Sequence, residues 1–383
     1  MGAGPLAGTL VLDLTRVLAG PYCTMVLSDL GARVIKIEPP GTGDDSRHIG
    51  PFMKGKSAYF MSINRGKESI ALDLKAPADR AVFERLLSVG DVLVENYRGG
   101  TMEKLGYGWE ALHPRFPRLV YAAASGFGHS GPYRTRAAYD MVVQGMGGIM
   151  SLTGHPGSPP TRVGTSVGDI TAGLFTAIGI NAALFERERT GLGRKVDVAM
   201  LDCQVAILEN AIARYFSTGQ VPGPLGARHP SITPFEAFRT GDGWMIVAAG
   251  NDGLFRRLAD ALGRPDLAAN PLFASNELRT RHAAALKAEI EQALAAHGTA
   301  HWLAAIDAAG VPCGPINDVA QALADPQVRA RNMVVSVDDP DVGELRMAGN
   351  PVKLSGVDDP ATRRPAPALD ADRARILAEL GLA

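Results

Sequence analysis

Cysteine, long apolar runs and an excess of one charge are what this chain of 383 residues lacks. Its cysteines, Cys23, Cys203 and Cys313, stand alone, and an odd number without a Cys-x-x-Cys pair argues against a disulfide framework. The 39 basic and 40 acidic residues are interspersed, which disfavours nucleic acid and anionic membranes as partners. No apolar run approaches about 20 residues, and residues 1–10 lack a basic region followed by an apolar core. We therefore expect an untargeted cytoplasmic protein.

Two common site motifs are also missing. His297 and His301 lie four residues apart, but Gly298 between them disfavours a shared helical face, so we expect no zinc or iron site. The turn after the first predicted strand, residues 15–21, lacks the Gly-x-Gly-x-x-Gly pattern of dinucleotide-binding folds. A nicotinamide or flavin cofactor is therefore disfavoured.

The remaining sequence alternates strands with helices. A hydrophobic content of 46% is enough for a large core and roughly two or three domains. Strands are predicted at 9–14, 34–38, 69–74, 91–97 and 119–125, with helices at 20–29 and 77–89. This order predicts an α/β fold with a parallel, doubly wound sheet.

The second part of the chain has a different pattern. After a predicted helix at 202–217, residues 219–234 are rich in Gly and Pro and predict a linker or substrate loop. A strand at 244–249 and helices at 254–262, 278–296 and 301–309 then indicate a smaller domain. Extended structure returns at 333–337, and a short helix is predicted at 371–380.

Asp169 is the most informative single residue. It follows the flexible stretch 163–168 and opens the apolar run 170–184, which places a carboxylate at a strand-to-helix turn. By position alone, the interpretation is a helix N-cap, because Asp accepts hydrogen bonds from first-turn amides. The alternative is a nucleophile whose charge the helix dipole favours by about 0.3 to 1 kcal/mol.

Several motifs, in order, carry a resemblance to a known family. They are Leu14 to Thr24, Asp29 to Ala32, Val34 to Asp44, Asn64 to Lys67, Leu72 to Lys75, Val94 to Tyr97, Gly126 to Pro132, Gly168-Asp169 and Val311 to Ile316. Together they cover nearly the whole chain, which resembles the family III CoA-transferases.

The resemblance implies a fold and an assembly. It implies a Rossmann-like large domain built from both chain ends, a smaller α/β domain between them, and an interlocked homodimer. The expected boundaries are 1–205 for the first part of the large domain, 206–229 for a linker, 230–325 for the small domain, and 326–383 for a linker and the return to the large domain.

The resemblance also implies a chemistry, with Asp169 as the nucleophile. Its carboxylate attacks an acyl-CoA thioester and expels a thiolate, whose acid has a pKa of about 8.5, to give a mixed anhydride. Coenzyme A then forms an aspartyl-CoA thioester, and an incoming carboxylic acid takes over the coenzyme A through a second anhydride. Acyl-CoA and coenzyme A are substrates here, and no permanently bound cofactor or metal is implied.

Two alternatives remain open from the sequence. The α-methylacyl-CoA racemases look similar, but their His and Glu positions fall on Tyr139 and Asn251. A phenol with a pKa of about 10 is a weak base and an amide cannot titrate, so transfer is favoured over proton abstraction. The other alternative is a CoA-binding homologue that kept the fold without the activity, in which Asp169 serves only as a cap.

The resemblance assigns binding residues less specifically. Coenzyme A contacts are expected from Leu18, Ala19, Leu72, Lys75, Asn96, Tyr97, Arg98, Lys104, Ala137, Tyr139 and Asp140. Tyr139 could instead be a packed aromatic whose hydroxyl bonds the backbone. Pro39 replaces a basic residue of the formyl-CoA transferases, so recognition at that point is in doubt.

The acyl pocket is expected to hold a small dicarboxylate. Arg47, Arg228 and His229 are candidates for binding its distal carboxylate, although a surface salt bridge is the alternative for each. The resemblance implies that residues 226–232 form a loop at the active site, and its glycine would allow the loop to open and close. A run of glycines found in the formyl-CoA transferases is missing, which argues against an oxalate-specific enzyme.

Overall fold

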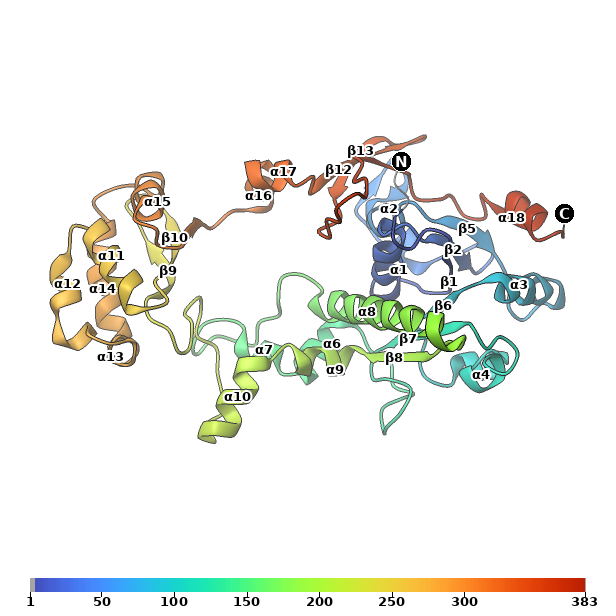
Figure 1. Ribbon diagram of the computed structural model, residues 1–383, viewed down its shortest axis with the longest axis horizontal. Coiled ribbons are helices and arrows are strands. Elements are labelled where there is room, and N and C mark those ends of the chain that lie inside the picture. Colours follow the sequence, from blue (N-terminus) through green and yellow to red (C-terminus); the bar gives the residue numbers. More distant parts are fainter. Residues whose placement is uncertain (1–3, 383) are drawn as a thin grey trace. The chain divides into compact units, whose positions relative to one another are not determined.

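The computed structural model describes residues 4–382 and divides the chain into two compact units (Figure 1). One unit comprises residues 4–151, 162–222 and 326–382, so it is built from both ends of the described chain. The other comprises residues 152–161 and 223–325. The first unit therefore contributes segments both before and after the second unit in the sequence.

The first unit contains a six-stranded parallel sheet. Its strands are β1 Leu10–Asp13, β2 Arg33–Glu38, β5 Glu68–Ala71, β6 Val92–Glu95, β7 Val120–Ser125 and β8 Lys195–Ala199. Their spatial order is β5-β2-β1-β6-β7-β8, and every neighbouring pair is parallel. This is the Rossmann order, with its topological switch point between β1 and β6. The predicted α/β fold is confirmed.

Helices cover both faces of this sheet. The relevant helices are α1 Ala19–Asp29 and α8 Val167–Thr190 on one face, and α3 Pro77–Val89, α4 Thr101–Leu105, α5 Trp109–Leu112 and α18 Arg373–Glu379 on the other. The strands are buried on both sides because successive apolar residues enter different cores: Val11 packs under α1 and α8, whereas Leu12 packs with α3. Ile376 of α18 joins the second core, so the chain end completes the layer.

Shorter elements complete the first unit. They are η1 Asp45–His48, β3 Phe52–Met53, β4 Lys56–Ser57, α2 Ala58–Asn64, α6 Asp140–Met146, α7 Ile149–Leu152, α9 Met200–Ala206, α10 Glu209–Thr218, α17 Pro326–Ala330, β12 Val334–Asp339, β13 Gly343–Ala348 and β14 Thr362–Arg363. The predicted helix at 202–217 is interrupted, because Glu209, at φ 23°, breaks the helical backbone between α9 and α10.

The second unit has a small antiparallel sheet, ordered β11-β10-β9, covered by helices. Its elements are β9 Phe235–Arg239, β10 Trp244–Ala248, α11 Asp252–Ala261, α12 Pro265–Ala269, η2 Pro271–Phe273, α13 Asn276–Arg281, α14 Ala283–Leu294, α15 Thr299–Ala308, β11 Cys313–Pro315 and α16 Val319–Ala324. The helix predicted at 278–296 is two helices, which meet at His282.

Helix α8 is long and apolar enough to span a membrane by length and composition alone, a test that core helices of soluble proteins also meet. Here it packs along α1 and against β7 and β8 (Figure 1). Its contacts place its first turn close to the start of α1.

Candidate active site

A pocket of about 190 Å³ opens where β1 and β6 end, at the switch point of the parallel sheet. The loop after β1, the loop after β6 and the segment 136–139 form its walls, and the first turn of α8 contributes Asp169. Eight of the residues predicted from the sequence line it: Leu18, Ala19, Asn96, Tyr97, Arg98, Ala137, Tyr139 and Asp169. The structure thus brings the expected nucleophile together with most of the expected coenzyme A contacts.

Asp169 is not the N-cap of its helix. Helix α8 begins at Val167 with Ser166 in the N-cap position, so Asp169 is the third helical residue. No residue in the described part of the chain donates a hydrogen bond to the Asp169 carboxylate. A first-turn amide of α8, that of Gly168, is instead bound by Asp140, which accepts its hydrogen bond at 2.8 Å. The capping interpretation is therefore wrong, and the Asp169 carboxylate is left available to a substrate.

A close approach of two helices places Asp169 beside the loop after β1. Gly173 lies one turn beyond Asp169 on α8, and a Cβ there would come within 2.7 Å of the Ala19 carbonyl oxygen. Only glycine allows the α1 and α8 backbones to approach this closely. Because residues four apart share a helix face, Asp169 is directed to the same side as the start of α1.

The charge of Asp169 is disfavoured in the folded chain. Burial, with a further contribution from the negative charge of Asp140, raises its pKa from 3.8 to about 7. This corrects the expectation that the helix dipole keeps the carboxylate fully ionised, because desolvation outweighs the dipole. Near neutral pH both the acid and the carboxylate are therefore populated.

Tyr59 is a residue that the sequence did not single out. It lies on α2, and burial together with the charges of Asp169, Asp44 and Asp140 raises its pKa to about 12. The phenol therefore stays protonated beside the acidic cluster and can donate a hydrogen bond. Because Tyr59 is about 110 residues from Asp169 in sequence, only the fold reveals this proximity.

Some predicted coenzyme A contacts do not line the pocket. Leu72 is 3% exposed and packs in the core beneath α3. Lys75 and Lys104 are exposed on the surface. Asp140 is buried and accepts hydrogen bonds from the Gly168 amide and from Gln144 Nε2, so it supports the first turn of α8. Tyr139 is 75% exposed, which contradicts the alternative of a packed aromatic.

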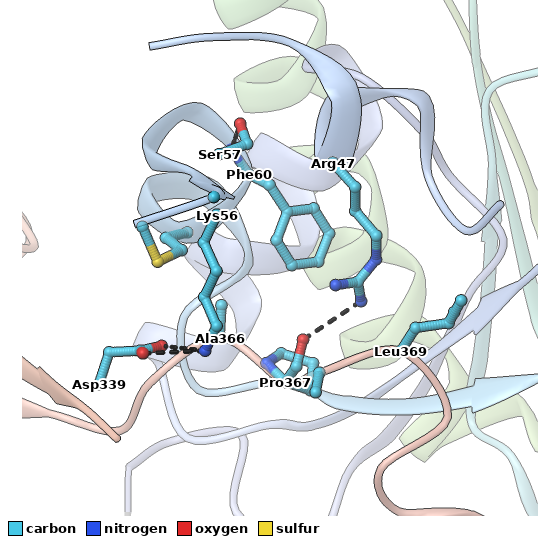
Figure 2. Close-up of a pocket in the computed structure, with 11 residues that line it drawn as sticks. Arg47, Lys56, Ser57, Phe60, Asp339, Ala366, Pro367 and Leu369 are labelled. Carbon is cyan, nitrogen blue, oxygen red and sulfur yellow. Dashed lines mark hydrogen bonds and ion pairs between the residues drawn. The ribbon is translucent and has the colours of Figure 1, made fainter. Parts of the chain in front are cut away.

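Arg47 lies in a different pocket, of about 200 Å³, shown in Figure 2. Its guanidinium donates to both carboxylate oxygens of Glu38 at 2.7 Å and to the Pro367 carbonyl at 3.2 Å, and it stacks on the Phe60 ring. In Figure 2 the Lys56 ammonium, on the other side of this pocket, meets Asp339. Glu38 already neutralises Arg47, so Arg47 is a weaker candidate for a substrate carboxylate than its sequence position suggested.

The other candidate substrate residues belong to the second unit. His229 stacks on Phe235 at 5.3 Å, and its Nδ1 accepts a hydrogen bond from the Ser231 amide. Arg228 is half-buried. Asn251, at the racemase Glu position, caps α11 by accepting a hydrogen bond from the Leu254 amide at 2.9 Å. A structural role therefore accounts for Asn251 without any proton transfer.

Known proteins resemble this chain over nearly its whole length. The family model for CoA-transferase family III matches residues 6–373. The acetyl-CoA:oxalate CoA-transferase of Acetobacter aceti is 49% identical over 98% of this chain and 96% of its own length. The succinate–glutarate CoA-transferase of Agrobacterium fabrum is 40% identical over 98% and 96%. A crystal structure of a CAIB/BAIF family protein from Brucella suis superposes with a TM-score of 0.86 at 41% identity, covering 99% of this chain and 100% of that one.

Proposed function

The chain belongs to CoA-transferase family III, and we propose that it moves coenzyme A from an acyl-CoA donor to a small dicarboxylic acid, with Asp169 as the covalent nucleophile. The observation that carries the proposal is the Asp169 carboxylate, free of hydrogen bonds from the described residues, in a pocket at the switch point of a Rossmann-like sheet. The membership itself rests on the family match and on relatives named as CoA-transferases.

In the proposed reaction the bonds balance without another reagent. An Asp169 oxygen attacks the thioester carbonyl, the carbon–sulfur bond breaks, and coenzyme A leaves as the thiolate. The thiolate attacks the aspartyl carbon of the anhydride and releases the donor acid. The acceptor carboxylate then attacks the aspartyl-CoA thioester, and the returning thiolate takes the acceptor acyl group, which regenerates Asp169.

The raised pKa of Asp169 suits this role. A carboxylate whose pKa is about 7 is a stronger base than an ordinary aspartate, and a stronger base is a better nucleophile. A more basic carboxylate favours attack on a neutral thioester carbonyl.

The dicarboxylate substrate is supported by the relatives. Their names specify oxalate in one case and succinate and glutarate in another. The first of these returns oxalate to the candidate acceptors, against the argument from the missing glycine run. Of the cationic side chains expected to hold a distal carboxylate, Arg228 has no ion pair among the described residues, whereas Arg47 is paired with Glu38. We favour Arg228.

We further propose a homodimer in the cytoplasm. Helix α8 leaves an apolar stripe exposed, with Leu174 41%, Ile178 62% and Phe185 69% accessible. These side chains lie on one face of the helix, and an exposed apolar face of this kind is typical of a surface that contacts another protein. We propose that a second copy of the chain covers it. The three cysteines are free thiols, as expected in a reducing compartment.

The test is a transfer assay with a panel of acyl-CoA donors and free acids, read by mass spectrometry of the thioesters. Wild type should exchange coenzyme A between diacids, and Asp169→Asn should remain folded and lose exchange. Near wild-type turnover by the folded variant would disprove the covalent mechanism. Rapid, Asp169-dependent deuterium exchange at the α-carbon of a branched acyl-CoA, without transfer, would instead indicate racemase chemistry.

A further inference from the structure

The turn after β1 is strained at Val17. Its φ of 66° lies in the left-handed region, which a β-branched side chain strongly disfavours. Val17 also lines the pocket that contains Asp169. Such a conformation persists only where surrounding groups impose it, and it is concentrated at functional sites.

Three side chains from other elements hold this turn by its backbone. Asp44 Oδ1 accepts a hydrogen bond from the Val17 amide at 3.0 Å. Asn96 makes two bonds to the preceding residue, accepting from the Arg16 amide at 2.9 Å and donating to the Arg16 carbonyl at 2.7 Å. Lys36 Nζ donates to the Thr15 carbonyl at 2.7 Å. Two consecutive peptide groups, Thr15–Arg16 and Arg16–Val17, are therefore fixed at both their carbonyl and their amide by side chains that are distant in sequence.

Two of these side chains form a buried ion pair. Lys36 Nζ lies 2.8 Å from Asp44 Oδ2, and their side chains are 0% and 1% exposed. The other Asp44 oxygen also accepts from the Ser46 amide and hydroxyl. Asp44 is thus held in place on both sides, so that it imposes a fixed position on the Val17 amide.

The turn leads directly to the part of α1 that touches α8. Leu18 and Ala19 follow Val17 and line the same pocket, and the Ala19 carbonyl faces Gly173, one turn from Asp169. A change in the backbone at Val17 therefore shifts the wall that faces the Asp169 carboxylate.

We propose that Asp44 and Asn96 are positioning residues, which hold Val17 in its strained conformation and thereby fix the backbone of residues 17–19 opposite Asp169 for acyl transfer. This inference rests on the proposed function, because it assigns these residues a role in the same reaction. Neither residue is required to touch the reacting atoms.

The first test is Asp44→Asn, assayed for kcat and KM in the coenzyme A transfer reaction. Asparagine has one acceptor oxygen where the carboxylate has two, so it cannot serve both Lys36 and the Val17 amide. We expect kcat to fall roughly ten- to a hundredfold, the range for a lost hydrogen bond to a charged group, with a smaller change in KM for the acyl-CoA. If the wild type is active in the same assay and the folded Asp44→Asn enzyme has an unchanged kcat, the positioning role of Asp44 is refuted, but the proposed function is not. Inactive wild type with every donor would count against the proposed function.

The decisive test is rescue at position 17. Glycine adopts φ 66° without strain, so Val17→Gly in the Asp44→Asn background should recover most of the lost kcat. Val17→Ala also removes the branched valine side chain, but alanine at φ 66° remains strained, so this substitution should not recover the lost kcat. Equal rescue by Gly and Ala, or none by either, contradicts the proposal.

A matched control separates positioning from a general loss of a buried ion pair. Asp339 pairs with Lys56 at 2.9 Å and accepts from the Asp341 and Val342 amides, much as Asp44 does, but lies in the other pocket. Asp339→Asn should leave kcat unchanged. If Asp44→Asn does not fold, the same pair of substitutions at Val17 is tested with Asn96→Ala, for which the same rescue by Gly and not by Ala is expected.

Discussion

Replacing Asp169 by asparagine should stabilise the fold at alkaline pH while abolishing transfer. The folded-state pKa of about 7 lies above the ordinary value of 3.8 because the carboxylate is buried near Asp140. A carboxyl group with a raised pKa opposes folding once the pH is high enough to ionise it. Asparagine has nearly the same shape and no charge, and no hydrogen bond from the described residues to the Asp169 side chain is lost.

The magnitude follows from the shift in pKa. At 1.36 kcal/mol per unit, a shift from 3.8 to about 7 corresponds to an upper limit of about 4 kcal/mol. The carboxylate faces an open pocket, and solvent screening lowers the expected gain to about 2 to 4 kcal/mol.

The pH window gives the sign. Below pH 4 both the folded and the unfolded chain carry a neutral Asp169, so Asp169→Asn should have no effect. Between about pH 4 and 7 the unfolded chain ionises first and wild-type stability falls; above pH 7 the full difference between wild type and variant should be present.

The assay is urea unfolding, followed by circular dichroism at pH 4, 6 and 8. Asp202→Asn is a control, because Asp202 is an exposed carboxylate in the first turn of α9, and its effect should stay within about 1 kcal/mol at every pH. Equal urea midpoints for wild type and Asp169→Asn at pH 8, or a gain that is just as large at pH 4, would refute the reasoning.

Three further outcomes are expected. The value of kcat/KM for the acyl-CoA donor should rise with pH and level off above an apparent pKa near 7, since the carboxylate form of Asp169 attacks; a flat profile from pH 5 to 8 would contradict this. The kcat/KM of the wild type should be roughly ten- to a hundredfold higher for glutarate than for butyrate, and Arg228→Ala should lose that preference. Arg47→Ala should mainly lower the free energy of unfolding, by about 2 kcal/mol, because Glu38 loses its bidentate partner. Light scattering at micromolar concentration should give twice the chain mass of 40.3 kDa, and a folded monomer would disprove the dimer.

Local sequence signals were sufficient for five of the six strands of the parallel sheet. The apolar runs of β1, β2, β6 and β7 and the amphipathic pattern of α3, Pro77–Val89, predicted their positions to within a few residues. These signals are local, because each strand here is buried on both faces and so shows a continuous apolar run. The interruptions at Glu209 and His282 were missed, since helix-forming residues continue on both sides of each break. Strand β8, Lys195–Ala199, was also missed: it is one of the two edge strands and is less buried than the other strands of the sheet.

The family motifs identified Asp169 as the candidate nucleophile, but they did not determine its position in the helix, its neighbours or its pKa. That Asp169 is the third helical residue, that Asp140 and Tyr59 lie close to it, and that its pKa is near 7 all depend on distances between segments far apart in sequence. Desolvation is a property of the surrounding atoms and not of the residue itself.

The hydrogen bonds to the Val17 turn and the ion pair of Arg47 show the same contrast between what the sequence determines and what the fold determines. The sequence by itself determined the residue types, most of the strands and helices of the parallel sheet, and the family. Only the tertiary structure decided that Asp44 reaches the Val17 amide and that Glu38 neutralises Arg47. Hydrogen bonds and ion pairs act over about 3 to 4 Å, and the folded chain alone brings such groups that close.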